Sequence, residues 1–471
     1  MIKGGKSKVE NSTLGILVMA AGKGTRMKSG LPKVLLPILD KPMLGYLLET
    51  VSNCGPDGVA VLVGHEGEQV CDYLKAFPGV EPLWQREQLG TGHAVQAARG
   101  WWERFDHVLV LNGDLPLLSL ATLRSFLGEH FEAKAACSLL SFVTEHPEGY
   151  GRVIRGPGGD GGGVTIVEHK DASPEQRLVR AVNAGCYIFE VKELSLVIDR
   201  IKNDNAQGEY YLPDAVALMS QAGLKVRGSV ADEEEASGVN TQAELAAMTL
   251  RVRNALAESW MAKGVRILDP SAVWIGPDVE LAPDVSLMPG VQIWGKSVVG
   301  EGSLVGPYCI LRNARLGRRV CLTAHVVVED SVLCDEAKAG PFAYIREGSL
   351  LKDRAFAGKF VELKKTTVGE NSKIPHLSYM GDAVLGENVN IGAGSVTCNY
   401  DGKNKFPTTI GDRCFVGSDT MMVAPVVLGD DSATAAGSTI TADVPAGALA
   451  VGRARQKNIE GWASRKHQMG K

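Results

Sequence analysis

Short apolar runs alternate with stretches of helical periodicity from residue 14 to about residue 240. Four runs lack regular polar positions and predict strands buried on both faces: GILVMAA from residue 15, GVAVLVG from 58, HVLVLNGD from 107 and ACSLLSFV from 136. The stretches YLLETVSNC, HAVQAARGWW and YLPDAVALMSQAG predict helices between them. This alternation predicts an α/β domain with a mostly parallel sheet, whose ligand lies beyond the carboxyl ends of the strands.

The pattern changes at residues 241–264, TQAELAAMTLRVRNALAESWMAKG. Apolar residues recur here at helical spacing without an internal glycine or proline, which predicts one long connecting helix ending at Gly264. Beyond it, aliphatic residues occupy every sixth position. The first seven are Ile275, Leu281, Leu287, Ile293, Val299, Val305 and Leu311.

The six-residue frame returns at Leu316, Leu322 and Val328, at Leu385 and Ile391, and at Ile410, Val416, Met422, Leu428, Thr434 and Ile440. Six residues make one short strand and a turn, so three repeats make one coil of a triangular β-solenoid with the aliphatic side chains inside. About ten coils, stacked ~4.8 Å apart, predict a prism about 50 Å long. The repeat alone also fits a spacer or an oligomerisation stalk.

Residues 333–383 interrupt this frame. Segments that break a repeat are commonly loops on a rigid scaffold, and such loops carry binding sites. We therefore expect a ligand site on loops in this interval.

Length and composition favour a multidomain globular protein with a small-molecule partner. A chain of 471 residues is too long for one core and suggests two or three domains. The net charge of -4 gives no reason to expect nucleic-acid or membrane binding. The leader before Leu14 has no secretory pattern, and the apolar stretch 14–21 is too short to span a bilayer, which predicts a cytoplasmic protein.

The nine cysteines are odd in number and include no Cys-x-x-Cys pair. This argues against both a zinc site and a complete disulfide framework, and it favours reduced thiols.

The segment LVMAAGKGTRM, residues 17–27, directly follows the first predicted strand. A glycine-rich turn between a strand and a helix can present several backbone N–H groups to one anion. The Walker pattern does not fit, because Gly24 separates Lys23 from Thr25. The dinucleotide fingerprint does not fit either, because Met27 stands in place of its third glycine. The loop therefore predicts a phosphate site of another kind.

Motifs of the first half resemble the signature of the sugar-1-phosphate nucleotidylyltransferases. They are AAGKGTRM, LPKVLLPILDKPML, QREQLGTGHAV, NGDLPLL, EGYGRVI, IVEHKDA, GEYYLPD and GVNTQAEL, in the expected order. The second half carries GPFAYIREG, GKFVELKKT, HLSYMGDAVLGENVNIGAGSVTCNYDGKNKF and FVGSD. Together, over nearly all of the chain, they resemble the family of bifunctional N-acetylglucosamine-1-phosphate uridylyltransferases/glucosamine-1-phosphate N-acetyltransferases.

This resemblance implies a Rossmann-like uridylyltransferase domain over 1–240, a linker helix over 241–264, and a left-handed parallel β-helix over 265–471 with a C-terminal tail. Glucosamine-1-phosphate would first be acetylated with acetyl-CoA. The product would then accept UMP from UTP, releasing pyrophosphate and UDP-N-acetylglucosamine, a precursor of bacterial envelope polymers such as peptidoglycan and lipopolysaccharide.

In the first half, the resemblance implies that the glycine-rich loop holds the UTP triphosphate. Arg26 and Lys33 are the implied catalytic cations, because negative charge crowds a reaction between phosphates. Mg²⁺ is implied at Asp114 and Asn240, whose oxygen atoms suit that ion. The implied nucleotide-binding residues are Ala20, Ala21, Gly22, Gly24, Lys33, Gln85, Gly90 and Thr91. The implied sugar-phosphate-binding residues are Gly151, Glu168, Asn183, Asn240 and either Tyr210 or Tyr211.

In the second half, His376 is the implied general base, because histidine can take the proton of an amine near neutral pH. The implied sugar-phosphate-binding residues are Arg346, Lys364, Tyr379, Asn390 and Lys405. The implied acetyl-CoA-binding residues are Asn399, Tyr400, Ser418, Ala436 and Arg453. A flat solenoid face cannot enclose two substrates, so the resemblance also implies a homotrimer with acetyl-transfer sites built between neighbours. The basic tail from Arg453 fits either a coenzyme A contact or a solvated end.

Three features depart from the family pattern. Asn112 stands where an aromatic residue is common, Ala184 stands where a threonine is common, and GPGGDGGG at 156–163 indicates an enlarged hairpin end. The first two place details of the sugar site in question.

Two alternatives remain open from the sequence. A single-activity sugar nucleotidylyltransferase with a regulatory or trimerising solenoid would share the first half, but it would not need the residues from His376 to Lys405. A noncatalytic assembly subunit could lose the loop lysine and the metal aspartate, yet Lys33 and Asp114 are both present.

Overall fold

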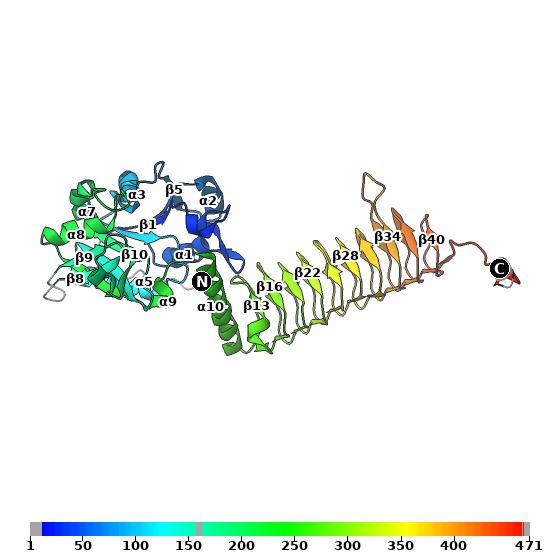
Figure 1. The fold of residues 1–471 in the computed structure, drawn as a ribbon. Coiled ribbons are helices and arrows are strands. Elements are labelled where there is room, and N and C mark those ends of the chain that lie inside the picture. Colours follow the sequence, from blue (N-terminus) through cyan, green and yellow to red (C-terminus); the bar gives the residue numbers. More distant parts are fainter. Residues whose placement is uncertain (1–11, 157–162, 464, 466–471) are drawn as a thin grey trace. The chain divides into compact units, whose positions relative to one another are not determined.

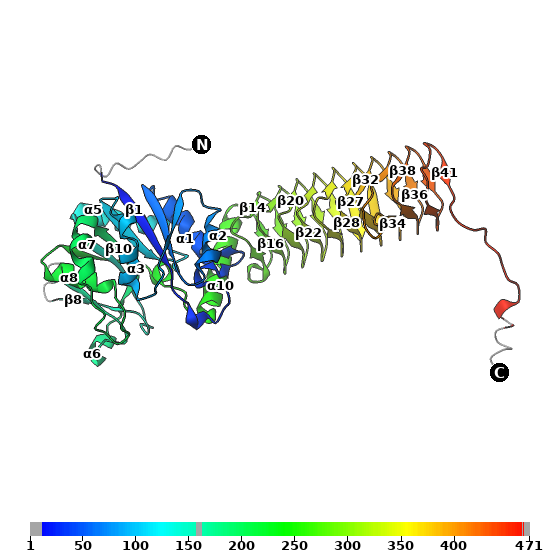
Figure 2. The same cartoon turned by 90° about the horizontal axis from the view of Figure 1, so that it is seen from above.

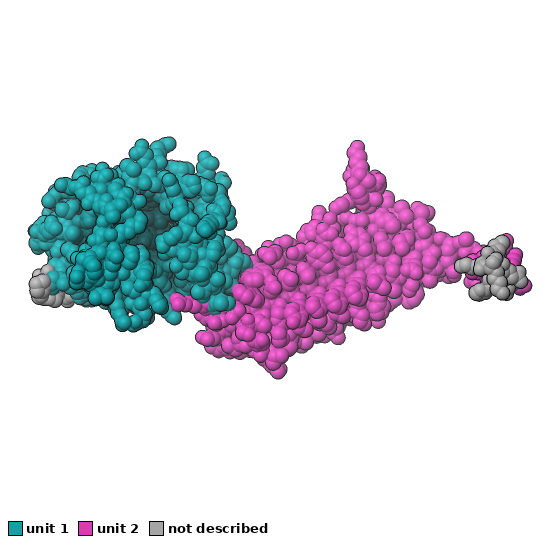
Figure 3. All heavy atoms as spheres, in the orientation of Figure 1, with its two compact units in different colours: residues 1–250 teal, residues 251–471 magenta. Residues whose placement is uncertain are grey.

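The chain forms two compact units. The computed structural model describes residues 12–156, 163–463 and 465. Unit 1 comprises residues 1–250 and unit 2 residues 251–471, so the division falls inside the long helix α10 (Gln242–Ala262) (Figure 3). Residues 1–11 of the leader, residues 157–162 of the glycine-rich hairpin end and the extreme C-terminus lie outside the described residues.

Unit 1 is built on one mixed sheet with the strand order β11-β7-β10-β6-β1-β4-β5, to which the β8–β9 hairpin is attached through β10 (Figure 1). Its strands are β1 (Leu14–Ala20), β4 (Gly58–Val63), β5 (Val80–Trp84), β6 (His107–Asn112), β7 (Cys137–Val143), β8 (Arg152–Arg155), β9 (Val164–Val167), β10 (Ala181–Glu190) and β11 (Val226–Val230). A separate two-stranded ribbon consists of β2 (Pro37–Ile38) and β3 (Lys41–Pro42).

Helices cover both faces of this sheet. They are α1 (Met43–Ser52), α2 (Gly67–Leu74), α3 (Thr91–Ala97), α4 (Arg99–Trp102), α5 (Leu120–Ala133), α6 (Pro174–Arg177), α7 (Val191–Val197), α8 (Pro213–Gln221) and α9 (Glu233–Ala236), with short 3₁₀ turns at Thr25–Met27, Lys33–Leu35 and Ile198–Arg200. In β1, Ile16 and Val18 pack with α1, α2 and α5, while Leu17 packs with α3, α4, α7 and α8. The unbroken apolar run follows from this, because both faces of the strand are buried.

The four predicted strands are confirmed as β1, β4, β6 and β7. Strand β10 runs antiparallel to both of its neighbours, so the sheet is parallel everywhere along its main order except at this strand. The helix predicted over 93–102 is two helices, because the backbone leaves helical geometry at Ala98. The predicted hairpin around 156–163 is present: β8 pairs antiparallel with β9, although its tip lies outside the description.

A buried histidine pair lies at the amino-terminal end of β6. His130 is 1% exposed, and its Nε2 lies 3.1 Å from Nδ1 of His107 while its Nδ1 lies 2.8 Å from the Ser138 hydroxyl. Burial, reinforced by the neighbouring His107, lowers the pKa of His130 to about 3. Burial also lowers the pKa of His107, against the opposing effect of Glu190 and Asp106. His130 is therefore neutral in the folded protein at ordinary pH.

This pair should make unit 1 acid-labile. Below the unfolded pKa of His130, near 6.5, the unfolded chain binds a proton that the folded chain does not, so stability falls as pH drops toward 3, by about 1.4 kcal/mol per pH unit for this group. We expect His130→Gln to flatten the pH dependence of the unit 1 unfolding transition between pH 7 and 5, measured by calorimetry, while His146→Gln, at an exposed position, leaves it unchanged. Equal slopes for His130→Gln and the wild type would contradict this account.

Unit 2 is a parallel β-helix whose three faces are parallel sheets of 11, 10 and 9 strands (Figure 2). We name the faces A, B and C in the order in which each coil visits them. Face A contains β12 (Arg266–Ile267), β15 (Ser286–Leu287), β18 (Leu304–Val305), β21 (Cys321–Leu322), β24 (Lys338–Ala339), β27 (Phe356–Lys359), β30 (Lys373–His376), β33 (Asn390–Ile391), β36 (Phe415–Val416), β39 (Ala433–Thr434) and β41 (Leu449–Ala450).

Face B contains β13 (Trp274–Ile275), β16 (Gln292–Trp294), β19 (Ile310–Arg312), β22 (Val327–Glu329), β25 (Tyr344–Ile345), β28 (Glu362–Lys364), β31 (Tyr379–Gly381), β34 (Val396–Cys398), β37 (Met421–Val423) and β40 (Thr439–Ile440). Face C contains β14 (Glu280–Leu281), β17 (Val298–Val299), β20 (Arg315–Leu316), β23 (Val332–Leu333), β26 (Leu350–Leu351), β29 (Thr367–Val368), β32 (Ala383–Leu385), β35 (Thr408–Ile410) and β38 (Val426–Leu428). The predicted interior residues of the six-residue frame are all buried, as a solenoid core requires.

The predicted interruption at 333–383 is wrong, because regular coils run through the whole interval. Alanine fills interior positions 339 and 357, where the six-residue frame expects a larger aliphatic residue. The frame also shortens to five residues on face C, as between Leu363 and Val368, which shifts every later interior position by one. His376 consequently ends a strand rather than lying on a loop.

The loop that does leave the solenoid is residues 399–407, between β34 and β35. Figure 1 shows it rising from the body of unit 2 beside β34. The predicted connecting helix is confirmed as α10, which ends at Ala262, two residues before Gly264 with its positive φ of 92°.

All nine cysteines lie within the described residues and are free thiols. None of the helices in the described ranges combines the length and hydrophobicity of a membrane-spanning segment.

Candidate active sites

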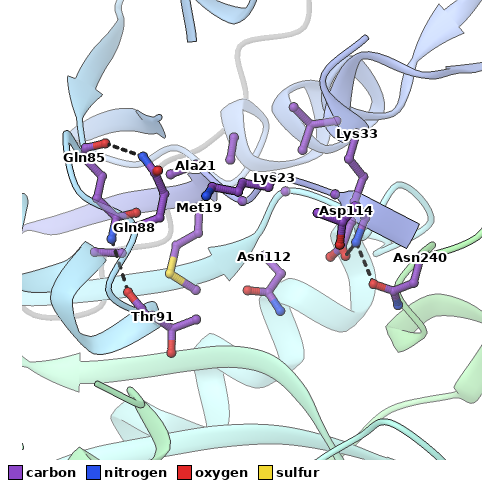
Figure 4. Close-up of a pocket in the computed structure, with 18 of the residues that line it drawn as sticks. Met19, Ala21, Lys23, Lys33, Gln85, Gln88, Thr91, Asn112, Asp114 and Asn240 are labelled. Atoms are coloured by element: carbon purple, nitrogen blue, oxygen red, sulfur yellow. Dashed lines mark hydrogen bonds and ion pairs between the residues drawn. The ribbon is translucent and has the colours of Figure 1, made fainter. Parts of the chain in front are cut away.

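A cavity of about 530 Å³ opens at the carboxyl ends of β1 and β6 in unit 1 (Figure 4). The predicted residues that line it are Ala20, Ala21, Gly22, Gly24, Arg26, Lys33, Gln85, Gly90, Thr91, Asp114 and Asn240. The lining residues that the sequence did not assign to the site are Met19, Lys23, Thr25, Val34, Gln88, Ala94, Asn112, Gly113 and Glu209. Most of them belong to the same motifs, so extending each motif by its neighbours would have found them.

The glycine-rich loop is shaped around Lys33. Gly24 has a positive φ of 56°, and a β-carbon at this position would lie 2.8 Å from Cβ of Lys33. A glycine is therefore needed for Lys33 to reach beneath the loop. Its side chain is only 15% exposed, so its ammonium group is held at the cavity wall and not in open solvent.

Lys33 forms the centre of a charged cluster. Its ammonium is ion-paired with Oδ2 of Asp114 and donates to Oδ1 of Asn240 at 2.7 Å. The same Asn240 oxygen accepts from Nη2 of Arg26 at 2.8 Å. Two cations thus converge on the aspartate and the asparagine at the mouth of the loop, and phosphate oxygens entering there would meet both.

Oδ1 of Asp114 is buried and has no hydrogen-bond partner among the described residues. A buried carboxylate oxygen without a partner is costly unless a cation or water satisfies it. Together with the Asn240 oxygen, it forms the hard oxygen donor set that Mg²⁺ prefers. The residues present therefore fit a divalent cation.

The opposite wall of the cavity is fixed by backbone contacts between Gly90–Gly92 and Tyr210. Gly92 N donates to Tyr210 O at 2.7 Å, and Leu212 N donates to the Thr91 hydroxyl at 3.0 Å. Gln85 is 3% exposed, and its side-chain amide donates to Gly90 O at 3.2 Å. Gln85, Gly90 and Thr91 therefore lie together in one wall of the cavity.

Of the predicted sugar residues, Asn240 lines this cavity, whereas Gly151, Glu168 and Asn183 lie outside its lining. Asn183 N donates to Gly151 O at 2.9 Å, and a β-carbon at Gly151 would lie 3.1 Å from Oε1 of Glu168. Burial, reinforced by Asp171, Asp214 and Glu209, raises the pKa of Glu168 to about 7. Of the two tyrosines, Tyr211 is 8% exposed and accepts a hydrogen bond from Gln207, while Tyr210 acts through its backbone.

The two residues that depart from the family's sequence pattern, Ala184 and Asn112, lie in different surroundings. Ala184 is buried in the core on the α1, α2 and α5 side of the sheet, so its side chain points away from the sugar residues and cannot contact a ligand there. Asn112 ends β6 and lines the cavity between Met19 and Asp114 (Figure 4).

In unit 2, strand register places several predicted residues in one column at the corner between faces A and B. His376 ends β30, and the register of the following coils aligns it with Ala393, Ser418 and Ala436. Ala393 was not predicted, because only the register reveals its place. Successive strands are ~4.8 Å apart, so Ser418 lies about 10 Å along the column from His376.

A basic cluster lies on face B. Arg346 and Lys364 follow the adjacent pair Ile345 and Leu363, and Lys405 reaches them from the 399–407 loop. Contact with Lys405 lowers the pKa of Lys364, because two ammonium groups oppose each other. Glu362 offsets part of this charge by accepting from Arg346 at 2.8 Å. Such opposed cations are suited to a phosphate.

Tyr379 lies on face B next to Glu362, whereas Asn390 lies on face A, so the structure separates these two predicted sugar-phosphate residues. Asn399 is buried and donates to Asp382 at 2.6 Å, which anchors the base of the loop. Tyr400 is exposed on that loop. Arg453 is exposed beside Gly437, one position beyond Ala436.

Fold and sites define a nucleotidyltransferase joined to a hexapeptide-repeat acyltransferase. Residues 16–156 match the MobA-like NTP transferase domain, and residues 407–442 match the hexapeptide repeat of succinyl-transferase.

The chain is also similar to three proteins named bifunctional protein GlmU. The one from Fervidobacterium nodosum is 45% identical over 453 residues, covering 96% of this chain and 98% of the relative. Those from Heliobacterium modesticaldum and Thermus thermophilus are 45% and 47% identical, with the same coverage of both chains. The chain belongs to the family of bifunctional GlmU proteins. Because the matches span both units, they favour the bifunctional reading over the single-activity alternative.

Proposed function

We propose that the chain makes UDP-N-acetylglucosamine by two reactions in two domains, residues 1–240 and residues 265–471, joined by the helix segment 241–264. The second domain transfers the acetyl group of acetyl-CoA to the amine of glucosamine-1-phosphate. The first domain then transfers UMP from UTP to N-acetylglucosamine-1-phosphate and releases pyrophosphate. The observation that carries this proposal is the similarity to bifunctional relatives over 96% of the chain.

In uridylyl transfer, the loop residues Ala20, Ala21, Gly22 and Gly24 hold the triphosphate, and Gln85, Gly90 and Thr91 hold the base. Arg26 and Lys33 place two cations where the phosphates of both substrates meet, so they stabilise the charge that develops between them. Gly151, Glu168 and Asn183 bind the N-acetyl sugar. A half-buried Glu168 that is partly protonated near neutral pH can either donate to or accept from a sugar hydroxyl.

Nucleotidyl transfer of this kind uses a divalent metal, and we assign Mg²⁺ to Asp114 and Asn240. When bound, the ion would supply positive charge to the phosphate oxygens. Asp114 Oδ1, buried without a partner in the described part of the chain, is the atom that supports this assignment. Asn240 is held by its neighbour Glu244, which accepts from the Asn240 backbone N–H at 2.6 Å.

In acetyl transfer, His376 takes the proton of the sugar ammonium and leaves a neutral amine to attack the thioester carbon. The C–N bond forms as the C–S bond breaks, and the second amine proton goes to the departing thiolate of coenzyme A. Arg346, Lys364 and Lys405 bind the sugar phosphate with Tyr379 and Asn390. Asn399 and Tyr400 orient the acetyl group, and Ser418 donates to the thioester oxygen as it gains charge. Ala436 and Arg453 contact coenzyme A, with Arg453 directed at its phosphates.

The acting form is a homotrimer joined through unit 2. An exposed apolar row follows the same corner as His376, in successive coils: Tyr308, His325, Phe342 and Phe360, with ring centroids 4.9–5.1 Å apart, and then Leu377. Phe360 is 58% exposed and Leu377 62% exposed. A contiguous apolar row of this kind favours contact with another chain. Because Tyr379 and Asn390 lie on different faces, a neighbouring chain at this corner would also help to enclose the substrates.

The assembly can be tested at Phe360. A carboxylate in the centre of a buried apolar contact would lack a partner, so we expect Phe360→Glu to shift the trimer to monomers at micromolar concentration. Sedimentation velocity would measure the change. Acetyl transfer should fall with the trimer while pyrophosphate release persists. Val427→Glu, exposed on face C, is the matched control and should stay trimeric. A trimeric Phe360→Glu protein would place the interface elsewhere.

The substrates also indicate where the enzyme acts. All of them are small phosphorylated or thioester metabolites, so we place the enzyme in the cytoplasm, where its nine free thiols stay reduced. Release of pyrophosphate from UTP and N-acetylglucosamine-1-phosphate, together with release of coenzyme A from acetyl-CoA and glucosamine-1-phosphate, tests the whole proposal. Absence of coenzyme A release from the wild-type trimer would leave a single-activity enzyme.

A further inference from the structure

Both ends of the 399–407 loop are bonded to one residue, Asp382. Asp382 is the single residue between β31 and β32, one coil before the loop. Its Oδ2 accepts a hydrogen bond from Nδ2 of Asn399 at 2.6 Å, and its backbone carbonyl accepts from Thr408 N at 3.1 Å. The first residue of the loop and the first residue after it are therefore attached to the same turn of the solenoid.

Asp382 also connects this loop to the basic cluster of face B. Its backbone N–H donates to the carbonyl of Lys364, one coil earlier, at 2.9 Å. Lys405, which the loop carries, contacts the side chain of Lys364, although both side chains end in ammonium groups. Like charges repel, so this contact pushes the loop away from the solenoid unless an anion lies between the two cations. The bonds of Asp382 oppose that repulsion.

The loop is a short hairpin, so a hold on its base also places Lys405. Tyr400 and Lys405 pair as an antiparallel bridge, and Phe406 N donates to the carbonyl of Asn399 at 2.9 Å. At the tip, Oδ1 of Asp401 accepts from two backbone N–H groups, at 2.8 and 2.6 Å. The hairpin thus has its own internal bonds, and its attachment to the solenoid depends on its base.

The carboxylate of Asp382 also determines which atom of Asn399 is available to a substrate. An ionised carboxylate only accepts hydrogen bonds, so it holds the Nδ2 atom of the amide and leaves Oδ1 as a free acceptor. Among the described residues, none donates to this Oδ1 atom. Asn399 is 6% exposed, and a β-carbon at Gly381 would lie 2.7 Å from its Nδ2. The amide is therefore enclosed in one orientation.

Asp330 occupies the equivalent turn three coils earlier, between β22 and β23. Both aspartates have a left-handed backbone, with φ of 44° at Asp330 and 49° at Asp382. Each donates its N–H to a carbonyl of the preceding coil, which for Asp330 is that of Arg312 at 2.9 Å. The carboxylate of Asp330, however, accepts from Asn313 in the preceding coil, at 3.0 Å. Asp382 differs because its carboxylate reaches forward to the residue that opens the loop.

We propose that Asp382 is a positioning residue for acetyl transfer, which orients the Asn399 amide and holds the 399–407 loop so that Lys405 stays in the sugar-phosphate site. This inference rests on the proposed function of unit 2. Asp382 acts through Asn399 and Lys405 and not by touching a substrate. A loop that is already in place need not be ordered when the sugar phosphate binds, which improves affinity, and an oriented amide raises the rate.

The test compares Asp382→Gly and Asp382→Asn with the wild-type enzyme. Glycine accepts the positive φ and keeps the backbone bonds, so it removes the carboxylate alone. Asparagine tolerates the same backbone and keeps an acceptor oxygen for Asn399. We expect Asp382→Gly to raise KM for glucosamine-1-phosphate about 5- to 50-fold and to lower kcat of acetyl transfer about 3- to 30-fold. Asp382→Asn should recover most of both losses.

Asp330→Gly is the matched control, because it removes the equivalent carboxylate from a turn that carries no loop. It should leave both constants at their wild-type values, and pyrophosphate release should be unchanged in every variant. Asp382→Ala, which also lacks the carboxylate, repeats the comparison if the unfolding temperature shows that Asp382→Gly does not fold.

Three results would overturn the inference: equal losses in Asp330→Gly and Asp382→Gly, unchanged KM and kcat in a folded Asp382→Gly protein, or an Asp382→Asn protein as defective as Asp382→Gly. Failure of the wild type to release coenzyme A would instead remove the proposed function of unit 2. The two kinds of failure are therefore distinguishable.

Discussion

His376→Ala is expected to lower the rate of acetyl transfer by about 10²- to 10⁴-fold, the range for loss of a general base. The amine of glucosamine-1-phosphate would then keep its proton in the complex, and a protonated amine cannot attack a thioester. The loss of thioester absorbance measures the rate directly. A thiol reagent is unsuitable because it would also react with the enzyme's own cysteines.

The same variant should keep full pyrophosphate release, because His376 belongs to unit 2. If His376→Ala retained most of the acetyl transfer of the wild type, another group would have to take the proton.

Asp114→Ala should lower pyrophosphate release by at least about 10²- to 10³-fold, a loss comparable to removing a principal charge-stabilising group. The variant loses the partnerless buried oxygen that fits the cation, and it also leaves the Lys33 ammonium without its ion pair. Acetyl transfer should stay unchanged. Pyrophosphate release in the presence of Mg²⁺ measures the first effect.

A binding measurement separates the cation from the chemistry. Mn²⁺ titrated into wild-type protein without nucleotide, followed by electron paramagnetic resonance, should bind, and Asp114→Ala should bind it far more weakly. A chelator should stop pyrophosphate release and spare acetyl transfer, and added Mg²⁺ should restore the activity. Equal Mn²⁺ binding by wild type and Asp114→Ala would move the cation site away from this carboxylate.

The sequence was enough to predict the fold where both faces of a strand are buried. Strands β1, β4, β6 and β7 are buried on both faces, so each appears in the sequence as an apolar run that predicts a strand. The antiparallel direction of β10 was not predictable, because an apolar strand carries no mark of its direction. The coils at 333–383 were missed because Ala339 and Ala357 fill the interior without resembling the larger aliphatic residues of the repeat.

The candidate sites were predictable from residues only where the site is local in sequence. The loop from Ala20 to Arg26 indicates a phosphate site without reference to any relative. The contact between Arg26 and Asn240 joins residues 214 positions apart, and only resemblance could pair them beforehand. Asn112 belongs to the motif NGDLPLL, but the room for its amide depends on Gly185 in β10, which only the fold brings beside it.

In the corner column of unit 2, the number of coils between two candidate site residues sets the distance between them. His376 and Ser418 are separated by two steps of stacking, so the span between them is a multiple of the strand separation, about 4.8 Å per coil. The 399–407 loop adds chain length without adding a step, since the strands on either side keep their register. An insertion at a corner therefore changes the chain that can cover a bound ligand, and it leaves the distances between the residues of the column unchanged.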